Sequence, residues 1–294
     1  MSEKRCTFAI VKDSIMETSA VHSNHSKTIS KMQQRHKDRR LYFKELANTS
    51  RKFYLDYVER WVPLNANTRV LEIGCGEGGN LLPFAEKGCH VTGIDIKEGQ
   101  IDNALLFFKE NNQEGEFIAS DFLLVPKPTT EEERYDVVLV HDVIEHIEAP
   151  YKAQFFQLLK HFMRNDAIVF FAFPAWQMPF GGHQQICVHA LSKVPFIHLL
   201  PTKLYRFLLT KTGQAEPIIE DLLSIKRSRM PIEKFEKLVR ETEMQVLDRT
   251  LWFINPHYQQ KFGLHPLREI WPLNKLVWIR NFYTTSAWYL LRKK

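Results

Sequence analysis

The sequence has 294 residues, a formal net charge of +6 at pH 7 and a hydrophobic content of 44%. This length suits one large or two small domains, and the hydrophobic content excludes a disordered chain because it is enough for a buried core. Its four cysteines have neither paired nor metal-ligand spacing, which excludes a disulfide scaffold and predicts a reduced, cytoplasmic protein.

Charge is distributed unevenly along the chain. Residues 61–150 carry 17 acidic against 6 basic side chains, whereas residues 1–60 carry 13 basic against 7 acidic and residues 151–294 carry 21 basic against 10 acidic ones. The acidic central part suits a cationic ligand, and the basic flanks suit anionic substrates or surfaces. No nucleic-acid-binding motif is present, so we expect no nucleic-acid partner. No apolar run is as long as a membrane span, so we expect no transmembrane segment.

The residues before the first predicted strand divide into two parts. Residues 1–30 are polar and are predicted to form a flexible arm. From residue 31 to residue 62, apolar side chains recur at helical spacing. We predict two helices here, separated at residues 48–50 and ended by Pro63.

The stretch from Val70 to Asn80 reads VLEIGCGEGGN, which predicts a strand, a glycine-rich turn and the start of a helix. Gly74 and Gly76 permit a sharp turn and a close approach of the backbone to a ligand because they lack a Cβ atom. The helix is then expected to direct free N–H groups toward that ligand. The glycine spacing also matches the dinucleotide fingerprint, so the turn alone leaves the class of ligand open.

Three further predicted strands each carry a polar residue at the carboxyl end. Asp95 follows Gly74 by 21 residues and is placed to accept hydrogen bonds from both hydroxyls of a ribose. Asp121 ends the third strand, where it is placed to accept from the exocyclic amine of adenine, and His141 ends the fourth. Together these strands predict a nucleoside-binding crevice at one edge of a parallel sheet.

The motifs LEIGCGEGGN, VTGIDI, ASDF and YDVVLVHDVIEHI resemble the successive motifs of the class I S-adenosylmethionine-dependent methyltransferases over residues 69–174. Within that family the VIEHI ending is most similar to small-molecule O- and C-methyltransferases such as those of ubiquinone biosynthesis. The resemblance implies S-adenosyl-L-methionine as the cofactor and a small acceptor, with lipophilic and aromatic compounds as candidates. By position it implies cofactor contacts from Glu72, Gly74, Cys75, Gly76, Asp95, Ile96, Asp121, Phe122 and His141.

The resemblance also implies a Rossmann-like, seven-stranded α/β sheet that is mostly parallel, with an antiparallel last strand and helices on both faces. Helices before the sheet commonly cover the cofactor in this family, which makes Arg40 and Tyr42 candidate lid residues. We therefore expect residues 31–294 to form one methyltransferase domain whose N-terminal helices occupy residues 31–62.

After Pro174 the alternation of strand and helix stops. Residues 175–230 are predicted to form an inserted cap after strand five, in which residues 196–209 form a cap helix or, as the alternative, a helix in peripheral contact with a membrane surface. Residues 225–229 are interpreted as a solvated loop. Beyond the cap we predict a helix from Pro231 to about residue 243, a strand over 245–254, a helix over 267–279 and the last strand over 283–291.

The cap begins with an aromatic residue, a Gly-Gly pair and His183, close to the predicted carboxyl edge of the sheet. A hydroxyl acceptor needs a general base, and an imidazole titrates in the suitable range. We predict His183 as this base, with His141 and His146 as rivals and a loop-packing histidine as the alternative.

Asp142, Glu145 and His146 have a spacing that some quinone O-methyltransferases use for a divalent metal, with Asp here in place of Glu. We expect hydrogen bonds at the start of a helix instead, and no metal site. Two other functions stay open: an NAD-type Rossmann oxidoreductase and a protein that binds the cofactor without turnover. The sequence leaves the acceptor atom and the oligomeric state undetermined.

Overall fold

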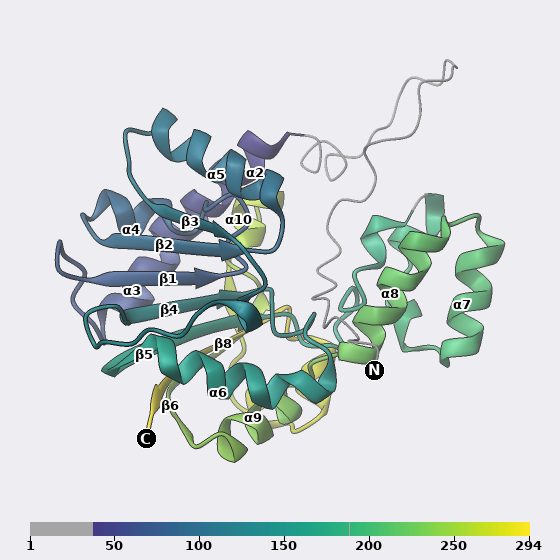
Figure 1. Ribbon diagram of the computed structural model, residues 1–294. Coiled ribbons are helices and arrows are strands. Elements are labelled where there is room, and N and C mark those ends of the chain that lie inside the picture. Colours follow the sequence, from purple (N-terminus) through teal and green to yellow (C-terminus); the bar gives the residue numbers. More distant parts are fainter. Residues whose placement is uncertain (1–37, 188) are drawn as a thin grey trace, which may run out of the picture.

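The computed structural model describes residues 38–187 and 189–294, so the predicted arm over residues 1–30 lies outside it. Eight strands form one sheet in the order β3-β2-β1-β4-β5-β8-β6-β7 (Figure 1). Strands β1 to β5 pair in parallel, and β8 lies antiparallel between β5 and β6. The mostly parallel sheet with an antiparallel last strand is confirmed, and a two-residue strand, β7, extends it at the β6 edge. The strands are β1 (Arg69–Ile73), β2 (His90–Asp95), β3 (Glu116–Ala119), β4 (Tyr135–His141), β5 (Met163–Phe173), β6 (Met244–Ile254), β7 (Leu267–Arg268) and β8 (Ser286–Lys293).

Helices cover both faces of the sheet, as Figure 1 shows. One hydrophobic cluster joins the sheet to α6 and α9, and a second joins the opposite face to α2, α3, α4 and α5. No helix in the described part of the chain is both long and apolar enough to cross a bilayer. The helices are α2 (Arg39–Thr49), α3 (Leu55–Glu59), α4 (Leu82–Glu86), α5 (Glu98–Glu110), α6 (Lys152–Phe162), α7 (Thr202–Lys211), α8 (Glu216–Ser228), α9 (Ile232–Glu241) and α10 (His257–Phe262).

Strand β5 shows why the sheet is buried on both sides. Its side chains alternate between the clusters, so Val169 and Phe171 belong to one and Ile168 and Phe170 to the other. All four are at most 1% exposed. A continuous apolar run of this kind is typical of a central strand between two helical layers.

The predicted separation of the N-terminal helices at residues 48–50 is wrong. The helix continues from α2 through a π-helical turn, Ser50–Tyr54, into α3. The Thr49 hydroxyl donates to the Glu45 carbonyl and the Ser50 hydroxyl donates to the Asn80 carbonyl, at 2.9 and 2.7 Å. Since these hydroxyls bond to carbonyls of the preceding turn and of a neighbouring segment, they do not interrupt the helix.

The described residues between 175 and 230 include short 3₁₀ turns, α7 and α8, and they share a small apolar core of their own. Figure 1 shows α7 and α8 standing apart from the helical layers of the sheet. The expected helix over 196–209 begins only at Thr202, directly after Pro201, and the predicted loop over 225–229 falls largely in the last turn of α8. That this region is an insertion into a single domain stays a prediction.

The helix predicted over residues 267–279 is wrong. This stretch contains β7 and short 3₁₀ turns at Leu273–Lys275 and Ile279–Phe282. Pro272 explains the difference, because it lacks a backbone donor and disfavours helical geometry in the residue before it.

The directions of the strands decide where the connecting segments lie. Strand β6 is antiparallel to β8, which is antiparallel to β5, so β6 runs in the same direction as β5. The segment between β6 and β8, residues 255–285, therefore lies at the carboxyl edge of the sheet. The cap follows β5 at that same edge.

Candidate functional site

A cavity of about 50 Å³ lies at the carboxyl ends of β1, β2 and β4. The structure brings Gly74, Cys75, Gly76, Asp95 and His141 together in its wall, from three separate strand ends. The other lining residues come mainly from α2 and from the turns after β1 and β4. They are Arg39, Tyr42, Leu46, Glu77, Asn80, Gln100, Asp142 and Val143.

The glycine turn has the geometry that the sequence predicts. Gly74 and Gly76 have φ angles of +73° and +53°, which side chains rarely tolerate. A Cβ atom on Gly74 would lie 2.4 Å from a methyl carbon of Val143, whereas one on Gly76 would meet only the Gln100 side-chain oxygen, at 3.6 Å. Gly74 is therefore needed for packing, and Gly76 leaves open the space of the cavity beside it.

The helix after this turn begins later than the sequence suggests. Helix α4 starts only at Leu82 and has five residues, so the backbone donor closest to Asp95 comes from the turn itself. The Gly76 N–H donates to Asp95 Oδ2 at 2.9 Å, and the Lys97 N–H donates to Oδ1 at 3.0 Å. Each carboxylate oxygen keeps a further lone pair, so Asp95 holds the turn and can still accept from hydroxyls.

We expect Asp95→Ala to weaken binding of S-adenosylmethionine by about tenfold to over a hundredfold. A charge-assisted hydrogen bond contributes about 1.5–3 kcal/mol, and the variant also releases the Gly76 N–H. Asp95→Asn is the matched control, because it keeps an acceptor of the same size without the charge. Its cofactor affinity should lie between those of the wild type and Asp95→Ala. Calorimetry that finds wild-type affinity in a folded Asp95→Ala protein would contradict the ribose assignment.

Glu72 lies beneath the turn and is 1% exposed. Burial raises the pKa of its carboxyl to about 8, the nearby Asp95 carboxylate adds to the rise, and the hydrogen bond from Asn80 opposes it. The Asn80 side-chain amide donates to Glu72 Oε1 at 2.7 Å, and Asn80 itself lines the cavity. Glu72 therefore orients Asn80 rather than lining this cavity directly.

The raised pKa of Glu72 predicts a pH-dependent stability. Below pH 4.5 the Glu72 carboxyl is protonated in both the folded and the unfolded protein. Between pH 4.5 and 8 it loses its proton only in the unfolded protein. The free energy of unfolding therefore falls by about 3–5 kcal/mol over this range. Glu72→Gln should lose this slope and be more stable than the wild type at pH 8. Urea unfolding at pH 5 and pH 8 measures the effect, and parallel losses in both proteins would contradict it.

Helix α2 covers the cavity with Arg39 and Tyr42. The Arg39 guanidinium donates to Glu77 Oε1 at 2.6 Å, so it balances the charge of a carboxylate that is 1% exposed. Arg40, which the sequence suggests as a lid residue, instead pairs with Glu110 at the exposed surface. Of the two predicted lid residues, Tyr42 lines the cavity and Arg40 does not; Arg39 lines it instead.

Three predicted adenine contacts, Ile96, Asp121 and Phe122, do not line this cavity. The Asp121 side chain accepts from the Leu123 N–H at 2.9 Å, and burial raises the pKa of its carboxyl. The Phe122 ring packs against Phe155, with 5.4 Å between ring centroids. Their roles toward a nucleoside stay predictions.

A second group of polar side chains joins the end of β4 to the cap. Glu145, His146 and His183 each offer a ligand atom, and these atoms lie within 4.8 Å of one another. The His146 and His183 rings meet edge-on, with 4.9 Å between centroids, and His146 Nε2 lies 3.8 Å from Glu145 Oε1. The sequence groups Asp142 with Glu145 and His146 at the start of a predicted helix. That helix start is wrong, because these residues lie in turns before α6, and folding groups His183 from a different loop with Glu145 and His146 instead.

The loop that carries His183 is held tightly. His183 has a φ angle of +56°, a conformation that costs a non-glycine residue about 1–3 kcal/mol. The buried side-chain amide of Gln184 donates to the carbonyls of Pro179 and Val194, at 2.8 and 3.1 Å. A Cβ atom on Gly182 would overlap His198, at 2.2 Å, so this glycine is required for the close packing of the loop.

Glu145, His146 and His183, which we call the trio, offer the nitrogen and oxygen ligands that suit a divalent transition metal. The trio also suits a general base, because the Glu145 carboxylate lies beside His146 and His146 contacts His183. Lys152, fully buried, donates to the carbonyl of Ile144 and so supports the turn that carries Glu145. Burial lowers the pKa of the Lys152 ammonium to about 7.

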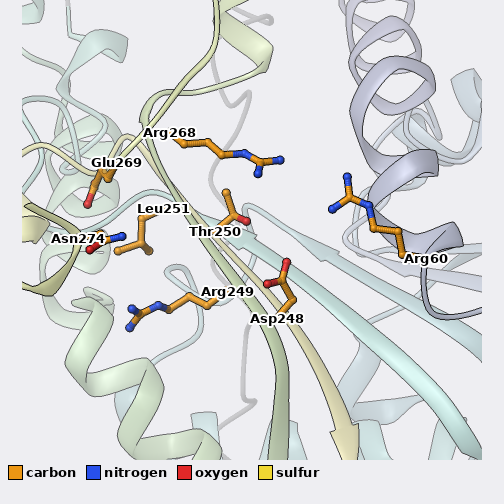
Figure 2. A pocket seen from close by; sticks show the side chains of 8 residues that line it. All are labelled: Arg60, Asp248, Arg249, Thr250, Leu251, Arg268, Glu269 and Asn274. Carbon is orange, nitrogen blue, oxygen red and sulfur yellow. The ribbon is translucent and has the colours of Figure 1, made fainter. Parts of the chain in front are cut away.

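A larger cavity of about 270 Å³ lies elsewhere, beside β6 and β7. Figure 2 shows the guanidinium groups of Arg60 and Arg268 pointing toward one another across it, with Asp248 and Thr250 between them. None of the residues that the sequence assigns to a site lines it. We therefore place the candidate site at the glycine turn.

The residues at the glycine turn fit the cationic cofactor that the sequence resemblance implies. Glu77 and Asp95 bring two carboxyl groups, both at most 5% exposed, to the wall of the cavity. Asn80 Oδ1 is buried without a hydrogen-bond partner in the described part of the chain, which leaves an acceptor beside the cavity. An acidic pocket with a spare acceptor suits an ammonium or sulfonium group better than a pyrophosphate.

Comparison with known proteins agrees with this geometry. A family model described as a methyltransferase domain matches residues 40–190. The ubiquinone biosynthesis O-methyltransferase of Rickettsia akari is 32% identical over 100 residues, which are 34% of this chain and 38% of that protein. The corresponding protein of Leptothrix cholodnii is 33% identical over 99 residues, or 33% of this chain and 40% of that protein. The matches thus span less than half the length of these relatives.

Solved structures share the fold. Magnesium protoporphyrin IX methyltransferase from Synechocystis has a TM-score of 0.52 at 14% identity, over 92% of this chain and 90% of that one. A putative sarcosine dimethylglycine methyltransferase from Galdieria sulphuraria has a TM-score of 0.53 at 13% identity, over 83% and 85%. The family match, the strand order and the glycine turn agree, and S-adenosylmethionine is the cofactor of the family that they indicate. This chain belongs to the class I S-adenosylmethionine-dependent methyltransferases.

Proposed function

We propose that this protein transfers a methyl group from S-adenosylmethionine to a hydroxyl of a small, lipophilic acceptor bound between the glycine turn and the cap. The observation that carries the proposal is the contact of His183, from the cap, with His146 at the end of β4. It brings a titratable group of the cap to the edge where the glycine turn lies. The names of the curated relatives support a quinone-like acceptor.

When bound, the cofactor supplies an electrophilic methyl group. In our proposal Asp95 accepts from the ribose, and the open space at Gly76 admits the methionine part. Arg39 and Tyr42 of α2 line the cavity. A cavity of about 50 Å³ is smaller than a nucleoside, so these side chains shift when a ligand enters. His141, beside Asp142, lines the floor.

His183 takes the proton of the acceptor hydroxyl in this proposal. The Glu145 carboxylate, beside His146, stabilises positive charge that develops on the two rings. Alternatively, Glu145, His146 and His183 would hold a divalent metal, which would supply a Lewis acid for the acceptor hydroxyl. The two uses differ in whether turnover requires added metal.

The proposal is tested by incubating the protein with labelled S-adenosylmethionine and a cell extract, and then separating organic-soluble from aqueous products. We expect the label in an organic-soluble product whose methyl group is bound to oxygen. The Gly76→Val protein is the control for transfer that does not depend on this site. Label found only in protein or in water-soluble compounds would contradict a lipophilic acceptor.

The NAD-type oxidoreductase is disfavoured by the family match. A protein that binds the cofactor without turnover remains the competing function, and the labelling experiment separates the two. The cytoplasmic location expected from the cysteines stays a prediction, as does the absence of a nucleic-acid partner.

A further inference from the structure

Residues 262–282, which we call the apolar edge segment, lead from the end of α10 toward β8 at the carboxyl edge of the sheet. Trp271 and Ile270 are 76% and 68% exposed, and Trp278 and Ile279 are each 56% exposed. Other large apolar side chains exposed along the segment include Phe262, Leu264, Leu267, Leu273, Val277 and Phe282. So many large apolar groups on one connecting segment indicate an interaction surface.

The polar side chains at the end of this segment face the protein. Arg280 is 3% exposed and pairs with Glu233 and Glu236 of α9. Asn281 is fully buried; its amide donates to Glu233 at 2.6 Å and its oxygen accepts from the Ile232 N–H at 2.8 Å. The segment is thus anchored to α9 by a buried polar network.

The backbone of the segment is also held in place. The Trp278 N–H donates to Glu233 Oε1 at 3.0 Å, and the Tyr283 hydroxyl donates to the Leu273 carbonyl at 2.8 Å. A surface loop of a water-soluble protein normally buries its apolar groups and exposes its polar ones. In this segment many large apolar side chains are exposed while Arg280 and Asn281 are buried, and this anchoring keeps the apolar side chains directed outward.

The charges along the segment have one sign where they are exposed. Lys275 is exposed, and Arg268 is exposed with its guanidinium directed into the cavity beside β6 (Figure 2), whereas Glu269, the segment's one carboxylate, is 8% exposed and accepts a hydrogen bond from Thr284. The surface therefore combines apolar side chains with positive charge. Such a surface complements an apolar layer bordered by negative charge.

The surface continues onto the cap. The rings of Phe196 and Phe282 lie 6.4 Å apart between centroids, and Phe196 and Val194 of the cap are 39% and 41% exposed. Both the cap and the apolar edge segment lie at the carboxyl edge of the sheet. A membrane that contacts this surface therefore lies on the side of the protein that carries the candidate site.

We propose that the apolar edge segment docks this protein on an anionic membrane surface, with Trp271 and Trp278 placed at the level of the lipid headgroups. Tryptophan is enriched at such interfaces because its ring is large and apolar and its N–H stays hydrated. A symmetric contact between two copies would bring Lys275 of one copy close to Lys275 of the other, whereas anionic headgroups neutralise this charge. Docking requires neither cofactor nor acceptor, so it does not rest on the proposed function.

Vesicle co-sedimentation of the full chain tests the proposal. We expect binding to vesicles of phosphatidylcholine with phosphatidylglycerol, and weaker binding to vesicles of phosphatidylcholine alone. The double variant Trp271→Glu and Trp278→Glu should lower the partition coefficient at least tenfold, to about the background level, because it replaces two inserted rings with charges that anionic lipid repels. Quenching of tryptophan fluorescence by brominated lipid should be seen in the wild type and lost in the variant.

The matched control replaces Leu105 and Leu106 with Glu. These residues are 49% and 44% exposed on α5, which covers β2 and β3 at the far end of the sheet, so this variant should bind like the wild type. Unchanged S-adenosylmethionine affinity in the tryptophan variant shows that it is folded. Equal vesicle binding by all three proteins would overturn the proposal. A wild-type dimer that ignores vesicles and dissociates in the tryptophan variant would overturn it in favour of an interface between copies.

Discussion

Gly76→Val is expected to lower the affinity for S-adenosylmethionine by about fivefold to over a hundredfold while the protein stays folded. The valine side chain would project toward the cavity, where a Cβ atom meets only the side-chain oxygen of Gln100. Overlap with a bound ligand typically costs about 1–3 kcal/mol or more, and each 1.4 kcal/mol is about tenfold in affinity. Isothermal titration calorimetry measures the loss.

Gly213→Val is the matched control for backbone strain. Gly213 has a φ angle of +71°, and a Cβ atom there would meet nothing within 4 Å. Both variants place a β-branched residue at positive φ, so both should lose comparable stability, but only Gly76→Val should lose cofactor affinity. Equal affinity in the two variants would show that the glycine turn has only a structural role.

His183→Ala is expected to lower turnover by about 10²–10⁴-fold and to leave cofactor affinity nearly unchanged. The reason is positional, because the cavity at the glycine turn is lined from β1, β2, β4 and α2, whereas His183 lies in the cap. The measurement is the rate of labelled methyl transfer to an acceptor identified in extract, across pH 6 to 9. His90→Ala, at the exposed amino end of β2, is the control and should retain wild-type turnover.

The same assay separates a base from a metal. A chelator should leave wild-type turnover unchanged if His183 acts as the base, whereas loss of activity that added divalent metal restores would assign Glu145, His146 and His183 to a metal site. Wild-type rates in His183→Ala would remove this residue from the mechanism. The proton would then pass to His141 or His146, or the acceptor would react as an anion.

The local sequence determined the secondary-structure elements that form the cofactor site. Alternating apolar strands, a glycine-rich turn and acidic strand ends are short-range signals, and parallel pairing brings such ends to one edge. The amino-acid sequence alone therefore suffices to assign Gly74, Gly76 and Asp95 to a common site. The antiparallel last strand came from the family resemblance, and the structure confirms it.

Local sequence patterns could not predict which side chains cover the site. Arg39 and Arg40 are adjacent, identical residues on an amphipathic helix, and only the packing of α2 decides that Arg39 reaches Glu77 while Arg40 reaches Glu110. A shift of one residue rotates a helix face by about 100°. Asn80 likewise gives no signal until the fold places Glu72 beneath it.

Only the tertiary structure decided two further features. It joined His183 to Glu145 and His146 across distant parts of the chain, which no sequence spacing encodes. It also showed that the C-terminal aromatic residues divide: Trp288 and Tyr289 are buried in the sheet, whereas Trp271 and Trp278 are exposed. The physical reason is that Arg280 and Asn281 pair with Glu233 of α9 and so direct the apolar side chains of the apolar edge segment outward. The periodicity of residues within one segment carries no information about a partner on another helix.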